Sequence, residues 1–390
     1  MVRMRCREEQ ARQAQCMGEH IVALRGWHPA LAQAEVRALF PNRIIHSFTS
    51  PRLMQFQLNE EDLPNVSVSS GIEALFKNGE NHAFTDVDSI REIIKSHLEL
   101  HPPNDESCAV VAWKHGRGIE GVSRSALAGR VGGLLSALDA QIDLENPKQR
   151  FGILLDEHSN SVTFGWLQGT GPKGDESVER RASQRPFFKP VSLEPRLARL
   201  AVNLASGPLH KGATLDPMTG TGGFAIEAAL SGREVVGLDL DVEMIAGAKK
   251  NLEWSGSTAN VFFQGDATNV QASIPDDAPQ SFSGIVLDPP YGRNSQGSLN
   301  HAELLKQTLL SCSTVVDDGS LVLILPSEAR ELCLETALPS DKRPELIHFE
   351  WPELEHLLVQ CNWKYENAWY VFVHGSLGRV VIFASSVPQD

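Results

Sequence analysis

A four-residue motif near position 290 carries groups suited to holding an exocyclic amino group. It reads Asp288-Pro289-Pro290-Tyr291 and follows a short apolar run. The Asp288 carboxylate can accept an N–H bond and, weakly, the released proton, and the prolines fix the backbone so that a carbonyl group serves as a second acceptor. The Tyr291 ring offers a stacking plane worth about 1–3 kcal/mol per base. We interpret these four residues as a catalytic set that aims an amino nitrogen at a methyl carbon.

A glycine-rich segment, residues 216–223, lies between a predicted strand and a predicted helix. Glycines let the backbone approach a ligand closely, and a helix N-terminus offers free N–H groups. A dinucleotide site uses the same device, so the carboxylates around the segment decide the ligand. Asp216 would repel a pyrophosphate but attract an ammonium or sulfonium group. Asp239 and Asp266 end the next two predicted strands, where they can bind ribose hydroxyls and an adenine amino group.

Three carboxylates at successive strand ends suit a ligand with a cationic end, a ribose and an adenine. S-adenosylmethionine fits this description better than NAD, and it is the cofactor that we predict. The residues expected to contact it in this part of the chain are Asp216, Met218, Thr219, Gly220, Thr221, Gly222, Asp239, Leu240, Asp266 and Ala267.

Strand and helix patterns alternate from residue 190 onward, which is typical of a parallel doubly wound sheet. Strands are predicted at 213–215, 234–240, 261–264, 284–287 and 321–325, with a closing hairpin of 369–373 and 379–383. Helices are predicted at 224–230 and 242–254. The second half is therefore expected to be an α/β, Rossmann-like domain with a mostly parallel seven-stranded sheet.

The first 170 residues predict a separate α+β region. An apolar strand at 21–24 leads through a Gly-Trp-His-Pro turn into a helix with apolar residues at three-to-four spacing. A helix at 88–100, a strand at 108–113, a helix capped by Ser123 and a hairpin of 151–155 with 162–166 follow. Residues 171–189 are rich in Gly, Ser and charge and indicate a basic linker that carries Arg180, Arg181, Arg185 and Lys189.

Composition and charge describe a globular protein. Of 390 residues 42% are hydrophobic, and no apolar run approaches the ~20 residues of a membrane span. The first sixteen residues show no signal-peptide core, so we expect a cytoplasmic location. The net charge of −14 is uneven, because residues 1–190 hold 22 Lys and Arg against 24 Asp and Glu, and the rest 13 against 25. A polyanion would bind the first half or the junction, although an acidic proteome also explains the total.

The six cysteines are widely spread, and no two have a Cys-x-x-Cys spacing. This pattern argues against a zinc site and a disulfide framework, and we expect no metal.

The two chemical motifs resemble the amino-methyltransferases of the Rossmann-like class, and their order is similar to that of the RNA guanine-N2 branch. Residues 189–199, Gly292-Arg293 and the segment 373–379 resemble the archaeal type of the tRNA guanosine-10 N2-methyltransferase family. Residues 142–147 resemble a THUMP domain, an RNA-binding module of tRNA-modifying enzymes. The likeness spans roughly 20–385. It departs at Met218-Thr219, where many relatives have Phe-Cys, a difference that bears on cofactor affinity.

This resemblance implies a polar tail at 1–17, a ferredoxin-like domain at 18–70, a THUMP domain at 71–170, a linker at 171–189 and a methyltransferase domain at 190–390. It adds Pro190 and Leu193 to the residues expected to contact the cofactor. For His374 and Arg379, a functional role and a structural role are equally open. It also implies that a group of basic residues grips the tRNA acceptor end: Lys114, His115, Arg117, Arg124, Arg130 and Arg150. Each of these charges, and each linker arginine, is also compatible with a merely solvated surface.

The function that the resemblance implies is methylation, or dimethylation, of the N2 amino group of guanosine 10 in tRNA. The expected partners are tRNA and a small activator subunit, in a monomer or a heterodimer. Three alternatives stay open: another tRNA or ribosomal RNA guanosine, a tRNA-binding protein with a vestigial cofactor fold, and a DNA adenine methyltransferase, which the same tetrapeptide permits.

Overall fold

The computed structural model describes residues 18–168, 176–189, 193–257, 261–290, 300–332 and 335–387. They form two compact units. The first contains the described parts of Met1–Trp27, Asn42–Val66 and Ile72–Gly174, and the second those of His28–Pro41, Ser67–Gly71 and Asp175–Asp390. The units interleave in sequence, so the domain boundaries predicted at residues 70, 170 and 189 stay predictions.

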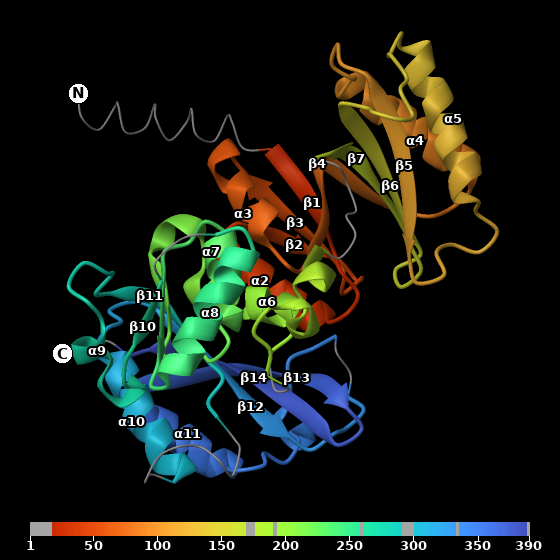
Figure 1. Cartoon of the computed structure of the whole chain (residues 1–390). Coiled ribbons are helices and arrows are strands. Elements are labelled where there is room, and N and C mark those ends of the chain that lie inside the picture. The colour runs from red at the N-terminus through yellow and green to blue at the C-terminus, as the bar shows by residue number, and fades with distance from the viewer. Residues whose placement is uncertain are drawn as a thin grey trace, which may run out of the picture. The chain divides into compact units, whose positions relative to one another are not determined.

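One seven-stranded sheet runs through the first unit in the order β2-β3-β1-β4-β7-β6-β5 (Figure 1). Only the pair β5 and β6 is parallel among these neighbours. The strands are β1 (Gly18–Leu24), β2 (Ile44–Ser47), β3 (Leu53–Leu58), β4 (Ile72–Ala83), β5 (Cys108–His115), β6 (Gln149–Asp156) and β7 (Ser161–Leu167).

Two helices of this unit, α4 (Val87–Leu100) and α5 (Arg124–Ala137), form a core with β5, β6 and β7. The predicted helices, the strand at 108–113 and the hairpin are confirmed. Ser123 caps α5 as expected, because its Oγ accepts the Ala126 amide at 3.3 Å. The short helix α3 (Leu63–Val68) follows β3 in sequence.

The second unit is built on a sheet of seven strands in the order β10-β9-β8-β11-β12-β14-β13. The first five are parallel and β14 runs antiparallel, so the predicted Rossmann-like α/β fold and the closing hairpin are confirmed. The strands are β8 (Ala213–Asp216), β9 (Val235–Asp239), β10 (Phe262–Gln264), β11 (Phe282–Leu287), β12 (Ser320–Ser327), β13 (Trp363–His374) and β14 (Leu377–Ser386).

Helices cover both faces of this second sheet (Figure 1). On one face, α10 (His301–Ser313) and α11 (Trp351–Gln360) share a core with Leu215, Ile285 and Leu323, while α6 (Pro195–Ser206) packs against β8, β11 and β12 on the other. The remaining helices are α7 (Gly223–Leu230), α8 (Val242–Trp254) and the short α9 (Val270–Ser273). Side chains alternate between faces along a strand, which is why both faces need an apolar cover.

The helix α2 (Pro29–Leu39) belongs to the second unit although its sequence precedes the first sheet's β2. Its fully buried Glu35 accepts hydrogen bonds from the Ser70 and Gly71 amides at 2.8 and 2.6 Å, and from Asn203 Nδ2 of α6 at 2.7 Å. A buried carboxylate is tolerated only when such donors replace water. Glu35 therefore fixes α2 on the α6 layer of the second unit.

Candidate active site

The glycine-rich segment turns sharply between β8 and α7. The Thr219 amide donates to the Leu238 carbonyl at 2.7 Å, which ties the turn to β9. Gly220 and Gly222 have φ values of +51° and +84°, a region that favours glycine. A Cβ on Gly222 would stand 2.9 Å from the Phe262 ring, whereas a Cβ on Gly220 would meet nothing within 4 Å. The turn is thus packed on one side and open on the side where a ligand could approach.

Asp216 lies at the end of β8, fully buried. Its Oδ2 accepts the Thr219 hydroxyl at 2.7 Å, and its Oδ1 has no hydrogen-bond partner. Burial, together with the nearby charges of Asp239 and Asp288, raises the pKa of Asp216 to about 8. A buried acceptor without a donor is costly, so this oxygen suits a cationic donor such as the ammonium group of an amino acid.

The other two predicted cofactor carboxylates also lie at strand ends, next to apolar residues. Asp239 Oδ2 accepts the Gly220 amide at 2.9 Å, which joins β9 to the glycine turn, and burial raises the pKa of this carboxyl. Leu240 beside it is 60% exposed, an apolar surface free to pack on a ligand. Asp266, exposed after β10, accepts the Thr268 amide with Oδ1 at 2.9 Å, and Ala267 is buried behind it.

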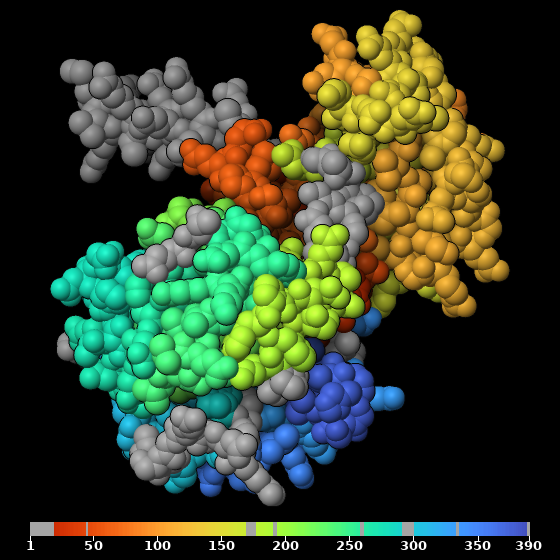
Figure 2. Space-filling view, in the orientation of Figure 1, coloured from red at the N-terminus to blue at the C-terminus, as the bar shows by residue number. Residues whose placement is uncertain are grey.

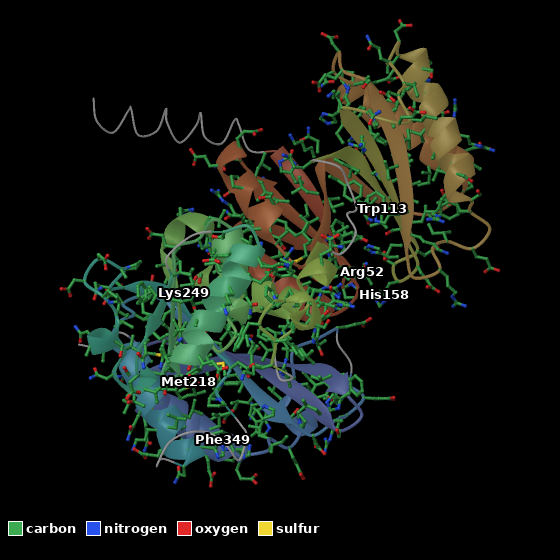
Figure 3. The ribbon with its side chains drawn as sticks, in the orientation of Figure 1. Arg52, Trp113, His158, Met218, Lys249 and Phe349 are labelled. Atoms are coloured by element: carbon green, nitrogen blue, oxygen red, sulfur yellow. The ribbon has the colours of Figure 1, made fainter. Side chains whose placement is uncertain are left out.

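The other predicted cofactor residues take different places. Met218 is partly buried and packs against the core of the sheet (Figure 3). Thr219, Thr221 and Leu193 are buried. Pro190 lies outside the described residues.

Asp288 follows β11, where it shares the carboxyl edge of the sheet with Asp216. Leu215 of β8 pairs with Ile285 of β11, so the two parallel strands deliver both carboxylates to the same edge. Burial raises the pKa of Asp288 to about 6, and the charge of Arg379 partly offsets this rise. Pro289 is buried and Pro290 exposed, and Tyr291 lies outside the described residues.

Arg379, which the sequence left open to a structural role, lies on β14 opposite Pro326 of β12. Arg379 lies close enough to the proposed catalytic carboxylate for its charge to lower the pKa of Asp288. The only signal for it in the sequence was its place in the segment 373–379 that resembles the family.

Two of the predicted linker arginines, Arg180 and Arg185, contact other parts of the second unit, whereas Arg181 is exposed. Arg180 donates to both oxygens of the buried Glu227 in α7, with Nε to Oε1 at 2.8 Å. Arg185 is only 5% exposed. Asn251 of α8 bonds both the amide and the carbonyl of Phe187 at 2.9 Å. Figure 2 shows this yellow-green segment beside the green residues of α7 and α8.

In the first unit, three of the predicted RNA-binding residues line one pocket of about 520 Å³: Lys114, Arg117 and Arg124. The pocket lies at the N-terminus of α5, with Ser123 and Ser125 on its wall. Arg117 is 92% exposed in its side chain and pairs with Glu157 at 2.8 Å. A helix N-terminus beside three cations favours an anion.

The remaining basic residues lie outside that lining. Arg130, further along α5, pairs with Asp88 at 2.6 Å, and Arg150 is a partly exposed residue of β6.

His115, expected with the RNA-binding residues, is instead buried. Its Nε2 lies 2.6 Å from Glu73 Oε2. Glu73 is also approached by Arg52 and Trp113, both labelled in Figure 3. The expectation for His115 was wrong, because β5 alternates and turns this side chain inward while the preceding Lys114 faces out.

Among the described residues, no group of three or more His, Cys, Asp or Glu side chains is placed to hold a metal ion. The same part of the chain contains no helix with the length and apolar character of a bilayer span.

A mostly parallel sheet with an antiparallel closing hairpin, a glycine turn after one central strand and carboxylates at neighbouring strand ends is typical of a Rossmann-like methyltransferase. Residues 182–350 match the family model described as UPF0020, RMKL-like, methyltransferase domain. The chain is 34% identical over 112 residues to a probable tRNA (guanine(10)-N2)-dimethyltransferase of Methanothermococcus thermolithotrophicus, covering 28% of this chain and 68% of that protein. It belongs to the tRNA (guanine(10)-N2)-dimethyltransferase family.

Two further relatives carry the same name. The protein of Pyrococcus abyssi is 40% identical over 156 residues, which cover 40% of this chain and 45% of that protein. The protein of Methanothermobacter thermautotrophicus is 37% identical over 150 residues, which cover 38% and 43%. The matched region thus spans less than half the length of these two relatives.

Proposed function

We propose that this protein transfers methyl groups from S-adenosylmethionine to the N2 amino group of guanosine 10 in tRNA. The observation that carries the proposal is Asp288 at the carboxyl edge of the sheet, beside the unpartnered Asp216 oxygen and the open side of the glycine turn. The names of the relatives reported above support the choice of guanine as the base and of position 10 in the tRNA. Because they are named dimethyltransferases, we extend the proposal to two successive transfers on the same nitrogen.

The residues at this edge fit the cofactor. The buried Asp216 Oδ1 lacks a donor, which the ammonium group of the methionine end would supply. In this proposal Asp239 would accept the ribose hydroxyls, and the exposed Leu240 and Asp266 would contact the adenine. Bound S-adenosylmethionine would supply an electrophilic methyl group. The acidic edge, formed by Asp216, Asp239 and Asp288, would stabilise the positive charge of the cofactor.

Asp288 then acts on the guanine. Its carboxylate accepts one N–H of the amino group, which orients the nitrogen and rejects a base that lacks the donor. Methyl transfer leaves a surplus proton on the nitrogen, and the carboxylate is placed to accept it. The charge of Arg379 lowers the pKa of this carboxyl, so Asp288 stays ionised at a lower pH than burial alone would allow. The target base must leave its stack to reach such an edge.

The pocket of the first unit would bind the RNA backbone. Lys114, Arg117 and Arg124 present separate cations around the α5 N-terminus, and phosphate oxygens are the ligands that such a site favours. Arg130 and Arg150 would add weaker contacts outside the pocket. A small activator subunit, in a heterodimer, is a further proposed partner, and a monomer is the alternative.

The test compares a tRNA transcript with its G10→A variant, by nucleoside mass analysis after incubation with S-adenosylmethionine. The proposal predicts N2-methylated and N2,N2-dimethylated guanosine from the first transcript and neither from the second. The same modified nucleosides from the G10→A transcript would refute position 10 and favour another guanosine. No methylated nucleoside from either would refute the activity itself.

A further inference from the structure

The hairpin of β13 and β14 extends beyond the carboxyl edge of the second sheet. Leu287, the last residue of β11, lies level with Ile382 of β14 and Ala368 of β13 through the pairing of the strands between them. From that level β13 continues to His374, where the chain turns into β14. The tip of the hairpin therefore stands roughly 15 Å past the level of Asp288, at the rise of a β-strand.

The hairpin lies on the side of Asp288 that is opposite the predicted cofactor residues. In the sheet, β8, β9 and β10 lie on one side of β11, and β12, β14 and β13 lie on the other (Figure 1). The first group of strands is followed or ended by Asp216, Asp239 and Asp266. A substrate that reaches Asp288 while a cofactor occupies the first side therefore approaches along the hairpin.

The register of the strands places two basic side chains on the face of the sheet that Asp288 shares. Directly paired residues have their side chains on one face, and faces alternate along a strand. His374 pairs with Leu377, two residues from Arg379, so the side chains of His374 and Arg379 share a face. Arg379 pairs with Pro326 of β12, and the parallel register of β11 and β12 gives Asp288 the same facing as Pro326. The charge of Arg379 acts on Asp288, in agreement with this placement.

Tyr370 anchors the hairpin to the segment that follows β12. Its side chain is buried, and its hydroxyl accepts the Arg330 amide at 2.7 Å. Its ring also lies against Gly378 of β14, where a Cβ would collide with the ring. The part of the hairpin that stands past the edge is thus held in one position.

The ring of His374 is oriented by the turn beside it. The residue is exposed, and its Nδ1 accepts the Ser376 amide at 3.4 Å and lies 3.1 Å from the Ser376 hydroxyl. Because an amide can only donate, the neutral ring carries its proton on Nε2. His374 therefore presents an N–H donor on the side of the ring away from Ser376.

We propose that His374, beside Arg379, binds a backbone phosphate of the RNA next to the target nucleotide. Residues 191–390 hold 13 Lys and Arg against 25 Asp and Glu, so most of this unit repels a polyanion. A strand that brings a base to Asp288 must place its phosphates near donors, and ring N–H and guanidinium groups are common partners of phosphate oxygens. The inference rests on the proposed function, because the RNA is the proposed substrate.

Charge substitutions at His374 test this contact, with affinity for a tRNA transcript measured by fluorescence anisotropy at several salt concentrations. His374→Lys is expected to bind roughly threefold more tightly, and its slope of log affinity against log salt should steepen by about 0.7–0.9 for the added phosphate contact. His374→Glu is expected to bind roughly tenfold or more weakly, because its carboxylate would face a phosphate. Affinity for S-adenosylmethionine should stay unchanged in both variants.

His356 is the matched control. It is an exposed histidine of α11, bonded to Gln360, and α11 ends just before β13 begins, far along that strand from the tip. His356→Lys and His356→Glu should bind tRNA as the wild-type protein does. Equal effects at the two positions, or unchanged tRNA affinity in both His374 variants, would overturn the inference.

Phosphate-ethylation interference then locates the contact on the RNA. With the wild-type protein, ethylation of the phosphates next to guanosine 10 should weaken binding, and this interference should be lost in His374→Ala. Interference that persists in His374→Ala would overturn the inference but leave the proposed function standing. Conversely, a wild-type protein that shows the His374 contact but transfers no methyl group would contradict the proposed function and support the contact.

Discussion

The two candidate binding regions of this protein are built in opposite ways. The pocket of the first unit presents cations on the surface, of which Arg117 is 92% exposed in its side chain. The acidic edge of the second unit holds carboxylates that burial keeps partly protonated, with the pKa of Asp216 raised to about 8. Solvated charges attract a polyanion at long range and are screened by salt, whereas buried charges discriminate between small ligands at contact. The first region therefore suits the phosphate backbone of a nucleic acid, and the second suits a small cofactor.

The largest effect is expected from Asp216→Asn, which keeps the shape but cannot ionise to pair with a cationic ligand. S-adenosylmethionine should bind roughly 100-fold more weakly by isothermal titration, because a charge-assisted hydrogen bond is lost. Binding of tRNA should be unchanged. An Asp216→Asn variant with wild-type cofactor affinity would contradict a role of Asp216 in binding S-adenosylmethionine.

The same substitution should stabilise the free protein. The folded-state pKa of Asp216 lies above its unfolded value, so the folded state holds the extra proton between about pH 4 and pH 8. The stability that this group contributes therefore falls as pH rises through that window. Thermal unfolding without cofactor should show Asp216→Asn gaining on wild type from pH 5 to pH 8. A gain that shrinks with pH would contradict the burial of this carboxyl.

A smaller loss is expected from the triple variant Lys114→Ala, Arg117→Ala, Arg124→Ala. Affinity for tRNA should fall by roughly tenfold or more, and the slope of log affinity against log salt should decrease by about 0.7–0.9 for each phosphate contact removed. Cofactor affinity should stay unchanged. Arg91→Ala is the control, since this partly exposed arginine pairs with Glu92 and does not line the pocket. Equal losses in control and triple variant would mean that the pocket has no special role.

The smallest effect is expected from Asn251→Ala, which removes the clamp between Phe187 and the glycine turn. The carbonyls of Phe187 and Thr221 would lose the Asn251 amide as a donor. The KM for S-adenosylmethionine should rise by roughly three- to tenfold with little change in kcat, because the turn is loosened and the catalytic carboxylate is untouched. A fall in kcat with unchanged KM would assign Asn251 to the chemistry instead.

The second unit could be predicted well from the sequence because its strands are continuous apolar runs and its turns are marked by Gly and Pro. Asp216, Asp239 and Asp288 were predicted at strand ends for the same reason. In the first unit β4 was not predicted. Its second half is polar, and its register shifts between Lys77 and Glu80, where Asn78 has a φ of +47°. A bulge of this kind breaks the alternation on which strand prediction depends.

The residues that prediction missed depend on contacts distant in sequence. Arg185 was interpreted as a linker charge because its neighbours are polar, and only the fold shows that Glu227 and the α7 N-terminus surround it. Arg379 is separated from Asp288 by two strands and their connections. The inward orientation of His115 followed from strand alternation and could have been predicted.

The most direct test of the account is methyl transfer by Asp288→Ala, measured beside cofactor binding and a pH profile. The account predicts that Asp288→Ala loses transfer to the G10 transcript while its affinity for S-adenosylmethionine persists. In the wild-type protein, transfer should fall as the pH drops through about 6, where this carboxyl takes up a proton. Full methyl transfer by Asp288→Ala, or a wild-type rate that is unchanged below that pH, would contradict the assignment of Asp288 as the catalytic carboxylate.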